Sequence, residues 1–216
     1  MKYKLVAFDL DGTIIDGTAS VWSTLHRFFG IDEHPERVAL RERFLSGEMT
    51  YGAWAVEDIK LLKKHGADRA SMLKALSSLK LMDGTRKTLE TLKARGCKLA
   101  IVSWSLDIVL QKFLPDYEKI FDHVYVHRLF FNGDGSIKNI VTDTKLRDKA
   151  VLLREICSKE GISPGDCVFV GDYDNDVEAA QLAGFSIAFN SKSEKLKEVA
   201  DVVIERKDLK EILKYL

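Results

Sequence analysis

The stretch "VAFDLDGTIID", residues 6–16, decides the fold and raises the first chemical question. Its apolar start belongs to a short β-type run, Lys4–Leu10, which we expect to be buried on both faces of a sheet. Two carboxylates, Asp9 and Asp11, stand one residue apart where that strand should end. Burying two unpaired carboxylates is costly, so the pair calls for a chemical explanation.

The pattern that follows this strand is helical. Residues 19–80 carry helical periodicity interrupted by glycine and proline, and no convincing strand. We predict four helices here: Val21–Phe29, Arg37–Leu45, Tyr51–Lys64 and Ala70–Leu79. The sequence thus indicates an all-helical insert after the first strand.

From Gly84 onward, strand and helix patterns alternate. Such alternation predicts a parallel sheet with helices on both faces, and "NGDGS", residues 132–136, predicts a hairpin turn. The expected strands are Lys98–Val102, Val124–Arg128, Ile137–Val141, Cys167–Val170, Ser186–Phe189 and Val202–Ile204. The expected helices are Thr85–Arg95, Leu106–Leu114, Lys145–Glu160, Asn175–Ala183 and Lys195–Val199, with an amphipathic segment at Leu209–Leu216.

The predicted fold class is therefore α/β: a Rossmann-like core with a parallel sheet, split by a small all-helical domain inserted after the first strand. We place the core at residues 1–15 and 83–216 and the helical domain at residues 16–82.

Composition limits the classes of partner. The 216 residues hold 33 Lys and Arg against 33 Asp and Glu, so no net field gathers polyanions, and we expect neither nucleic-acid nor membrane binding. No apolar run approaches the ~20 residues of a membrane span, and no signal peptide is recognisable. Three cysteines without a CxxC and five histidines without HExxH favour ordinary buried residues in a reducing cytoplasm. We expect a monomer or homodimer.

Polar residues follow three of the predicted core strands. Asp9 and Asp11, Ser103, and Asp172 each come after a strand end, where open parallel sheets bind ligands. The stretch "GDYDND", residues 171–176, adds acidic groups to the same edge. A hard divalent cation would relieve the repulsion, and Mg²⁺ suits such oxygen ligands. The positions that an EF-hand reserves for Gly and Glu hold Val177 and Ala183, and neither GxxxxGK[ST] nor GxGxxG occurs.

Four of these segments resemble, in order, the motifs of the haloacid dehalogenase-like phosphohydrolases. They are "DLDGT" (residues 9–13), Ser103 at the end of "KLAIVS", Lys149, and "GDYDND". The stretches "GISPGDCVFVGDYDND" and "ADVVIERKDLKEILKYL" resemble the phosphoserine phosphatase-like branch, and the helical insert resembles its cap domain.

The resemblance implies a Mg²⁺-dependent phosphatase acting on a small phosphorylated metabolite. Asp9 would be the nucleophile that forms an aspartyl-phosphate, and Asp11 the general acid and then the base. Asp9, the Asp11 backbone carbonyl and Asp172 would hold Mg²⁺, with Asp176 supporting the metal from behind or through water. Ser103 and Lys149 would bind the phosphoryl oxygens. Thr13 would join them or orient Asp9, and Lys145 is a rival of Lys149.

The chain departs from the resemblance where specificity is set. Serine-specific relatives place a glutamate about seven residues after the second motif aspartate, where this chain has Thr18. The position of their cap arginine aligns with Asp58, and Trp104 stands where they have small residues. We therefore expect a phosphatase that is not phosphoserine-specific, with Thr18, Tyr51, Trp54 and Trp104 as pocket candidates. A phosphomutase, or a non-catalytic binding protein on the same fold, is the alternative.

Overall fold

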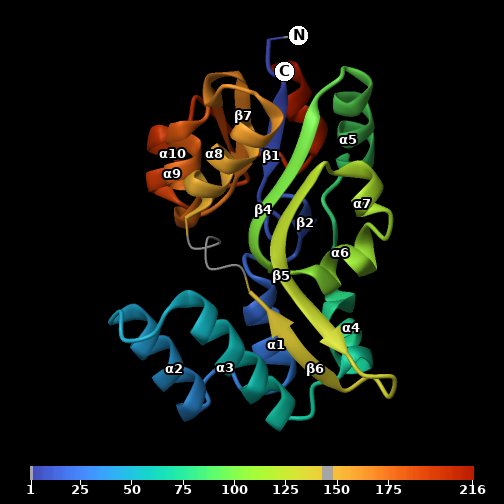
Figure 1. Cartoon of the computed structure of the whole chain (residues 1–216), viewed down its shortest axis with the longest axis vertical. Coiled ribbons are helices and arrows are strands. Elements are labelled where there is room, and N and C mark those ends of the chain that lie inside the picture. The colour runs from blue at the N-terminus through green and yellow to red at the C-terminus, as the bar shows by residue number, and fades with distance from the viewer. Residues whose placement is uncertain (1, 143–147) are drawn as a thin grey trace.

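Strand β1 (Leu5–Phe8) is the centre of a seven-stranded sheet with the order β6-β5-β4-β1-β7-β8-β9 (Figure 1). The computed structural model describes residues 2–142 and 148–216. β1 pairs in parallel with β4 (Lys98–Leu106) and with β7 (Cys167–Gly171). The outer strands are β5 (His123–Phe131), β6 (Ile137–Val141), β8 (Phe185–Phe189) and β9 (Val202–Ile204). β6 is antiparallel to β5, and the other pairings of this sheet are parallel.

At β1 the chain changes the side of the sheet to which it adds strands. After β1 the chain builds β4, β5 and β6 on one side, and then returns to build β7, β8 and β9 on the other. A reversal of this kind leaves a crevice beyond the carboxyl ends of the central strands, because the connections leave in opposite directions.

Both faces of β1 are covered by helices, as expected from its apolar sequence. Leu5 and Ala7 belong to the core under α8 (Lys149–Glu160), α9 (Val177–Leu182) and α10 (Glu194–Val199). Val6 and Phe8 belong to the core on the opposite face. That face is covered by α5 (Thr85–Ala94), α6 (Asp107–Phe113), α7 (Tyr117–Ile120) and the 3₁₀ helix η5 (Leu209–Lys214), on the other side of the sheet in Figure 1.

A helical insert follows β1 and lies below the sheet in Figure 1. It contains α1 (Val21–Phe28), α2 (Pro35–Leu45), α3 (Tyr51–Lys64), α4 (Arg69–Ala75) and the 3₁₀ helix η1 (Leu76–Ser78). The two-residue strands β2 (Ile15–Asp16) and β3 (Lys80–Leu81) pair where the chain enters and leaves it. The α/β fold with an inserted helical domain is confirmed.

The turn of the β5–β6 hairpin, predicted from "NGDGS", reaches this insert. The Arg69 N–H donates to the Gly135 carbonyl at 2.9 Å, and Asp68 forms an isolated bridge with Ser136. The hairpin therefore contacts the start of α4 as well as the sheet.

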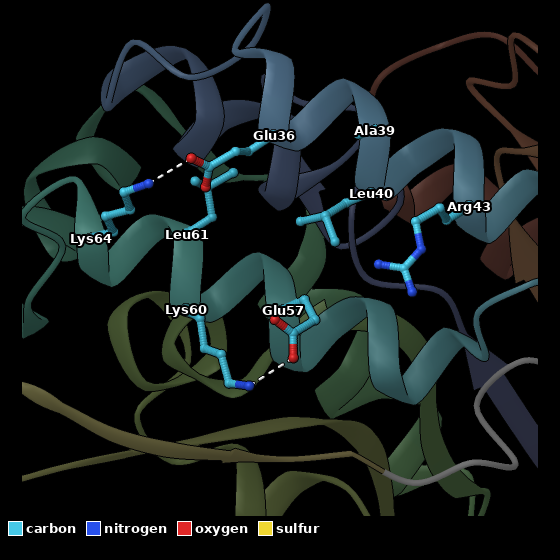
Figure 2. Close-up of a pocket in the computed structure, with 8 residues that line it drawn as sticks. All are labelled: Glu36, Ala39, Leu40, Arg43, Glu57, Lys60, Leu61 and Lys64. Atoms are coloured by element: carbon cyan, nitrogen blue, oxygen red, sulfur yellow. Dashed lines mark hydrogen bonds and ion pairs between the residues drawn. The ribbon is translucent and has the colours of Figure 1, made fainter.

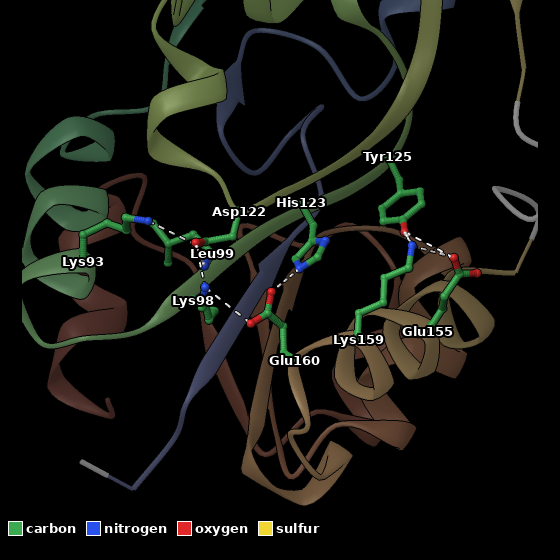
Figure 3. A network of polar contacts seen from close by, with 9 residues as sticks. All are labelled: Lys93, Lys98, Leu99, Asp122, His123, Tyr125, Glu155, Lys159 and Glu160. Atoms are coloured by element: carbon green, nitrogen blue, oxygen red, sulfur yellow. Dashed lines mark hydrogen bonds and ion pairs between the residues drawn. The ribbon is translucent and has the colours of Figure 1, made fainter.

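A network of polar contacts near the starts of β4 and β5 connects α5, on one face of the sheet, with α8 on the other (Figure 3). Asp122, just before β5, accepts from the Lys93 ammonium on α5 and from the Leu99 N–H. Lys98 lies between Asp122 and Glu160 of α8, which also contacts His123. These groups lie at the end of the sheet opposite to the carboxyl ends of β1 and β7.

Several element boundaries differ from the predictions. β4 continues past Val102 to Leu106, with a shift in its pairing with β5, so Ser103 lies within the strand. The predicted helix at Asn175–Ala183 begins as a 3₁₀ turn, η4 (Asp174–Asp176), and the chain end at η5 is 3₁₀ rather than α. A further 3₁₀ turn, η3 (Pro164–Asp166), precedes β7.

Two further expectations from the sequence concern membrane-spanning helices and disulfide bonds. None of the helices in the described ranges is both long and apolar enough to cross a membrane. The three cysteines are buried and form no disulfide, and the sulfurs of Cys157 and Cys167 lie 3.2 Å apart.

Candidate active site

The loop after β1 turns sharply around Gly12. The Asp9 N–H extends the β1–β7 pairing by donating to the Val170 carbonyl at 2.9 Å. Gly12 has φ +80°, and a Cβ built there would lie 2.1 Å from Asp172 Oδ2. A glycine is therefore required on both counts, because the turn needs the left-handed region and the loop packs directly against Asp172.

The register of the central strands brings distant residues to one edge. Phe8 pairs with Ile101 of β4 and with Val170 of β7. Asp9 and Asp172 follow these strands closely, and both are buried and line one cavity together with Ser103. Because the carboxyl ends of parallel strands meet at one edge of a sheet, the sequence already predicted that these three residues lie close together.

Lys149 is the buried cation of this edge. It is the first residue of α8, after the N-cap Asp148, whose side chain accepts from the Val151 N–H. Its Nζ lies 2.6 Å from Asp9 Oδ1 and 2.5 Å from Asp176 Oδ1, and its side chain is fully buried. Burial alone would lower the pKa of Lys149, but the Asp176 and Asp9 carboxylates outweigh burial and raise the pKa above its ordinary value. The ammonium thus stays charged.

Asp176 is fixed on both sides of its carboxylate. While Oδ1 contacts Lys149, Oδ2 accepts from the backbone N–H groups of Asp172 and Tyr173 at 2.9 and 3.1 Å. Asp176 therefore fixes the position of the Lys149 ammonium and of the loop that carries Asp172.

The acidic residues at this edge are suited to a cation. Asp9, Asp172 and Asp176 each offer an oxygen, and these oxygens lie within 4.8 Å of one another. Asp172 Oδ1 is buried and has no hydrogen-bond partner among the described residues. Burial, together with repulsion from Asp9 and Asp176, raises the pKa of Asp172 far above its usual range. An oxygen-rich site with an unsatisfied buried carboxylate fits Mg²⁺.

Asp11 connects the core to the helical insert. Its Oδ2 accepts from the Val21 N–H at the start of α1 at 2.7 Å, and its Oδ1 accepts from the Ser105 hydroxyl at 2.8 Å. Burial and then repulsion from Asp9 raise the pKa of Asp11 to about 7. A carboxyl with this pKa is partly protonated at neutral pH and is able to give and take a proton.

The predicted phosphate-binding residues lie around the same loop. Thr13 is fully buried, and its Oγ1 has no partner among the described residues. The Ser103 hydroxyl accepts from the Ser105 N–H at 3.3 Å. Lys145, considered as a rival of Lys149, lies outside the described residues.

A cavity of about 410 Å³ lies above these groups. Of the four pocket candidates, Tyr51, Trp54 and Trp104 line it, whereas Thr18 lies in an adjoining hollow and hydrogen-bonds to Ser20 and Thr24. Trp22, Phe44 and Ser105 also line the cavity and were not among the site residues predicted from the sequence. His127, one of the five histidines expected to be ordinary, is buried, and its Nε2 lies 3.0 Å from the Tyr51 hydroxyl.

A second groove, of about 310 Å³, lies between α2 and α3 (Figure 2). Glu36 of α2 pairs with Lys64 of α3 at 2.5 Å, and Glu57 pairs with Lys60 along α3. Its described lining contains no member of the acidic edge, and its fifth charged residue, Arg43, pairs with Glu48 at 4.0 Å. The first cavity is therefore the candidate site.

Comparison with known proteins agrees with this geometry. A family model described as haloacid dehalogenase-like hydrolase matches residues 3–184. The phosphoserine phosphatase of Methanocaldococcus jannaschii is 32% identical over 218 residues, covering 100% of this chain and 98% of that protein. The phosphoglycolate phosphatase of Pasteurella multocida is 29% identical, with 86% and 84% covered.

A solved structure of a substrate-bound phosphoserine phosphatase complex superposes with a TM-score of 0.77 at 30% identity, covering 100% of this chain and 99% of that one. The chain belongs to the haloacid dehalogenase-like hydrolases.

Proposed function

We propose that this haloacid dehalogenase-like hydrolase is a Mg²⁺-dependent phosphatase that hydrolyses a small phosphomonoester through an aspartyl-phosphate on Asp9. The observation that carries the proposal is the meeting of the Asp9, Asp172 and Asp176 carboxylates with the buried Lys149 ammonium beneath one cavity. The similarity to two kinds of named phosphatase supports it.

Magnesium would be held by the carboxylates of Asp9 and Asp172 and by the backbone carbonyl of Asp11, with Asp176 supporting it through water. When bound, the ion supplies the positive charge that lets a phosphate dianion approach a carboxylate. The unpartnered Asp172 Oδ1 supports this assignment.

In the first half of the reaction, the Asp9 carboxylate attacks phosphorus and the bond from phosphorus to the leaving alcohol breaks. Lys149 orients the nucleophile through Oδ1. Asp11 gives its proton to the departing alkoxide, and its raised pKa suits a proton donor at neutral pH.

In the second half, the deprotonated Asp11 takes a proton from water, which attacks the aspartyl-phosphate and releases inorganic phosphate. Ser103, Thr13 and Lys149 bind the phosphoryl oxygens in both halves. The buried position of all three supports this role, because water competes little for their hydrogen bonds.

The helical insert, residues 16–82, is proposed to act as a cap on the core formed by residues 1–15 and 83–216. Its Trp22 indole N–H and Tyr51 hydroxyl donate to the Trp104 carbonyl at 2.9 and 3.2 Å, which holds the insert against β4. Hinge motion near Asp16–Thr18 and Met82–Gly84 would admit substrate and then exclude water.

The substrate is proposed not to be phosphoserine. Asp58, at the aligned position of the relatives' arginine, is fully buried and lies 2.6 Å from His26 Nε2, while Arg37 donates to His26 Nδ1. Asp58 therefore serves the packing of α1, α2 and α3. We further propose a cytoplasmic enzyme, a monomer or homodimer, acting on a small phosphorylated metabolite, in keeping with the three buried cysteines.

Phosphate release from 4-nitrophenyl phosphate, with Mg²⁺ or with EDTA, tests the proposal. Asp9→Asn should abolish turnover, and chelation should do the same. Asp174→Asn is the matched control, because Asp174 lines the same cavity but pairs with the exposed Lys195. Turnover by Asp9→Asn would refute the mechanism. A panel of phosphoserine, sugar phosphates and nucleotides tests specificity, and a strong preference for phosphoserine would refute that part.

A further inference from the structure

The cavity above Asp9 has two chemically different halves. Its floor carries Asp9, Asp11 and Asp172. The other half is formed by what we call the aromatic wall: Trp22, Phe44, Tyr51, Trp54 and Trp104. No lysine, arginine or histidine is found among the lining residues within the described ranges. The wall thus offers ring surface and no positive charge.

The rings of the aromatic wall pack against one another. The Tyr51 ring centroid lies 4.5 Å from that of Trp104 and 5.7 Å from that of Trp54, to which it is nearly parallel. The Phe44 ring packs against both Tyr51 and Trp54, and the ring centroids of Trp22 and Trp54 lie 5.4 Å apart. Rings in mutual contact form one continuous surface, whereas a box for a cation needs rings on opposite sides of an open space.

The polar ends of two wall residues are already satisfied. The Trp22 N–H and the Tyr51 hydroxyl both donate to the Trp104 carbonyl. These residues therefore present ring surface to an occupant and no free hydrogen-bonding group. The Trp54 indole N–H is the exception, because it is buried and has no partner among the described residues. A carboxylate against this wall would find at most that one neutral donor and no cation, so it would not recover the hydration it loses.

Two apolar side chains at the mouth remain uncovered. Leu45 is 68% exposed and Tyr173 is 49% exposed, although both line the cavity. An occupant with a carbon body that extends from the floor to the mouth would cover them, and burial of apolar surface is favourable.

We propose, on the basis of the phosphatase function above, that the substrate is the phosphate monoester of an alcohol whose body is apolar or aromatic and uncharged. The phosphate lies on the acidic floor with its metal, and the body lies on the aromatic wall. Selection against carboxylate-bearing esters follows from the absence of a cationic partner in the described lining.

Alkyl phosphates have similarly poor leaving groups. Differences in kcat/KM among them therefore report how the cavity binds the body of the alcohol and any charge on it. We expect kcat/KM for 2-phenylethyl phosphate to exceed that for ethyl phosphate by about tenfold or more, the effect of burying a ring. Its 4-carboxy derivative should fall by at least a similar factor. The neutral 3,3-dimethylbutyl phosphate should match or exceed its cationic isostere, phosphocholine. A preference for the carboxylate or for phosphocholine would overturn the proposal.

Phe44→Ala should lower kcat/KM for 2-phenylethyl phosphate about tenfold, mainly through KM, and lower that for ethyl phosphate by a much smaller factor. Phe28→Ala is the matched control, because Phe28 is an exposed ring of the same insert that does not line the cavity. Arg27→Gln tests the adjoining hollow, which Arg27 lines. Equal effects of the two phenylalanine variants, or a loss of turnover in Arg27→Gln, would overturn the proposal.

A binding readout separates this inference from the phosphatase proposal. All three tryptophans of the chain line the cavity, so their fluorescence reports its occupation. In Asp9→Asn with Mg²⁺, 2-phenylethyl phosphate should change the emission at lower concentration than its 4-carboxy derivative does. Selective binding without turnover by the native chain would sink the phosphatase proposal alone, whereas turnover with reversed selectivity would sink only this inference.

Discussion

Lys149 Nζ lies 2.6 Å from Asp9 Oδ1, although 140 residues separate the two in the chain. The same ammonium contacts Asp176, so one buried cation serves two buried carboxylates. This contact joins the first strand of the core to the start of α8 and sets the charge of the site.

Replacing Lys149 by Met should destabilise the metal-free protein by about 3–5 kcal/mol, because two carboxylates would stay buried without their cation. Lys195→Met is the control. It removes an exposed partner of Asp174 and should cost much less, because solvent screens an exposed ion pair. Urea unfolding in EDTA at pH 7 measures both. Equal losses would mean that the buried contact is no stronger than a surface pair.

Mg²⁺ should stabilise the native chain against unfolding, by about 2.7 kcal/mol at a hundredfold excess over its Kd. Asp172→Asn should abolish this gain and stabilise the metal-free protein, because it removes a carboxylate that is repelled by Asp9 and whose Oδ1 has no partner within residues 2–142 and 148–216. Thermal unfolding with and without Mg²⁺ provides the measurement, with Asp174→Asn as a control that keeps the gain. An undiminished Mg²⁺ effect in Asp172→Asn would rule out Asp172 as a ligand.

Gly12→Ala and Gly30→Ala form a matched pair. Both glycines have positive φ, +80° and +66°, so each alanine should cost about 1–2 kcal/mol of backbone strain. Only at Gly12 would the added Cβ also meet the Asp172 carboxylate, whereas nothing lies within 4 Å at Gly30. Gly12→Ala should therefore lose Mg²⁺ binding and activity as well as stability, and Gly30→Ala should keep both functions. Retained Mg²⁺ affinity in Gly12→Ala would contradict the packing described here.

Asp107 should make stability fall as pH rises. Burial raises the pKa of Asp107, so the folded chain binds more protons than the unfolded chain between the ordinary pKa and the raised one. Asp107→Asn keeps an oxygen that can accept from the Leu129 N–H, and its advantage over the native chain should grow with pH through that window. Asp116→Asn should behave oppositely, because Arg86 lowers the pKa of Asp116 and native stability is lost as pH falls. Calorimetry from pH 3 to pH 8 compares them, and parallel curves for all three proteins would refute the assignment.

The parts of the site that the sequence predicted are those set by a general rule. Asp9 and Asp172 follow central strands, Ser103 lies in the last part of β4, and parallel strands share one carboxyl edge. Three helices of the insert, α1, α3 and α4, bury residues, and a buried face imposes a 3.6-residue period. The fourth, α2, buries none, but Pro35 and Gly47 mark its two ends in the sequence. The two-residue strands β2 and β3 were missed, since so short a segment carries no period to detect.

The remaining features depend on how elements pack, and no local pattern records that. Trp22 and Phe44 lie on different helices, and their place in the cavity follows from the orientation of the insert on the core. The contact of Ser105 with Asp11 exists because β4 runs on past Ser103. Thr18 faces the adjoining hollow because its hydroxyl is held by Ser20.

The central place of β1 affects how the chain matures on the ribosome. β1 leaves the exit tunnel before its two neighbours, β4 and β7, which are encoded roughly 90 and 160 codons later. At about 5–20 residues per second, the nascent Asp9 waits on the order of 10–30 s for Asp172 to be synthesised. Until Asp172 has been synthesised, the growing polypeptide therefore lacks one of the carboxylates of the proposed magnesium site.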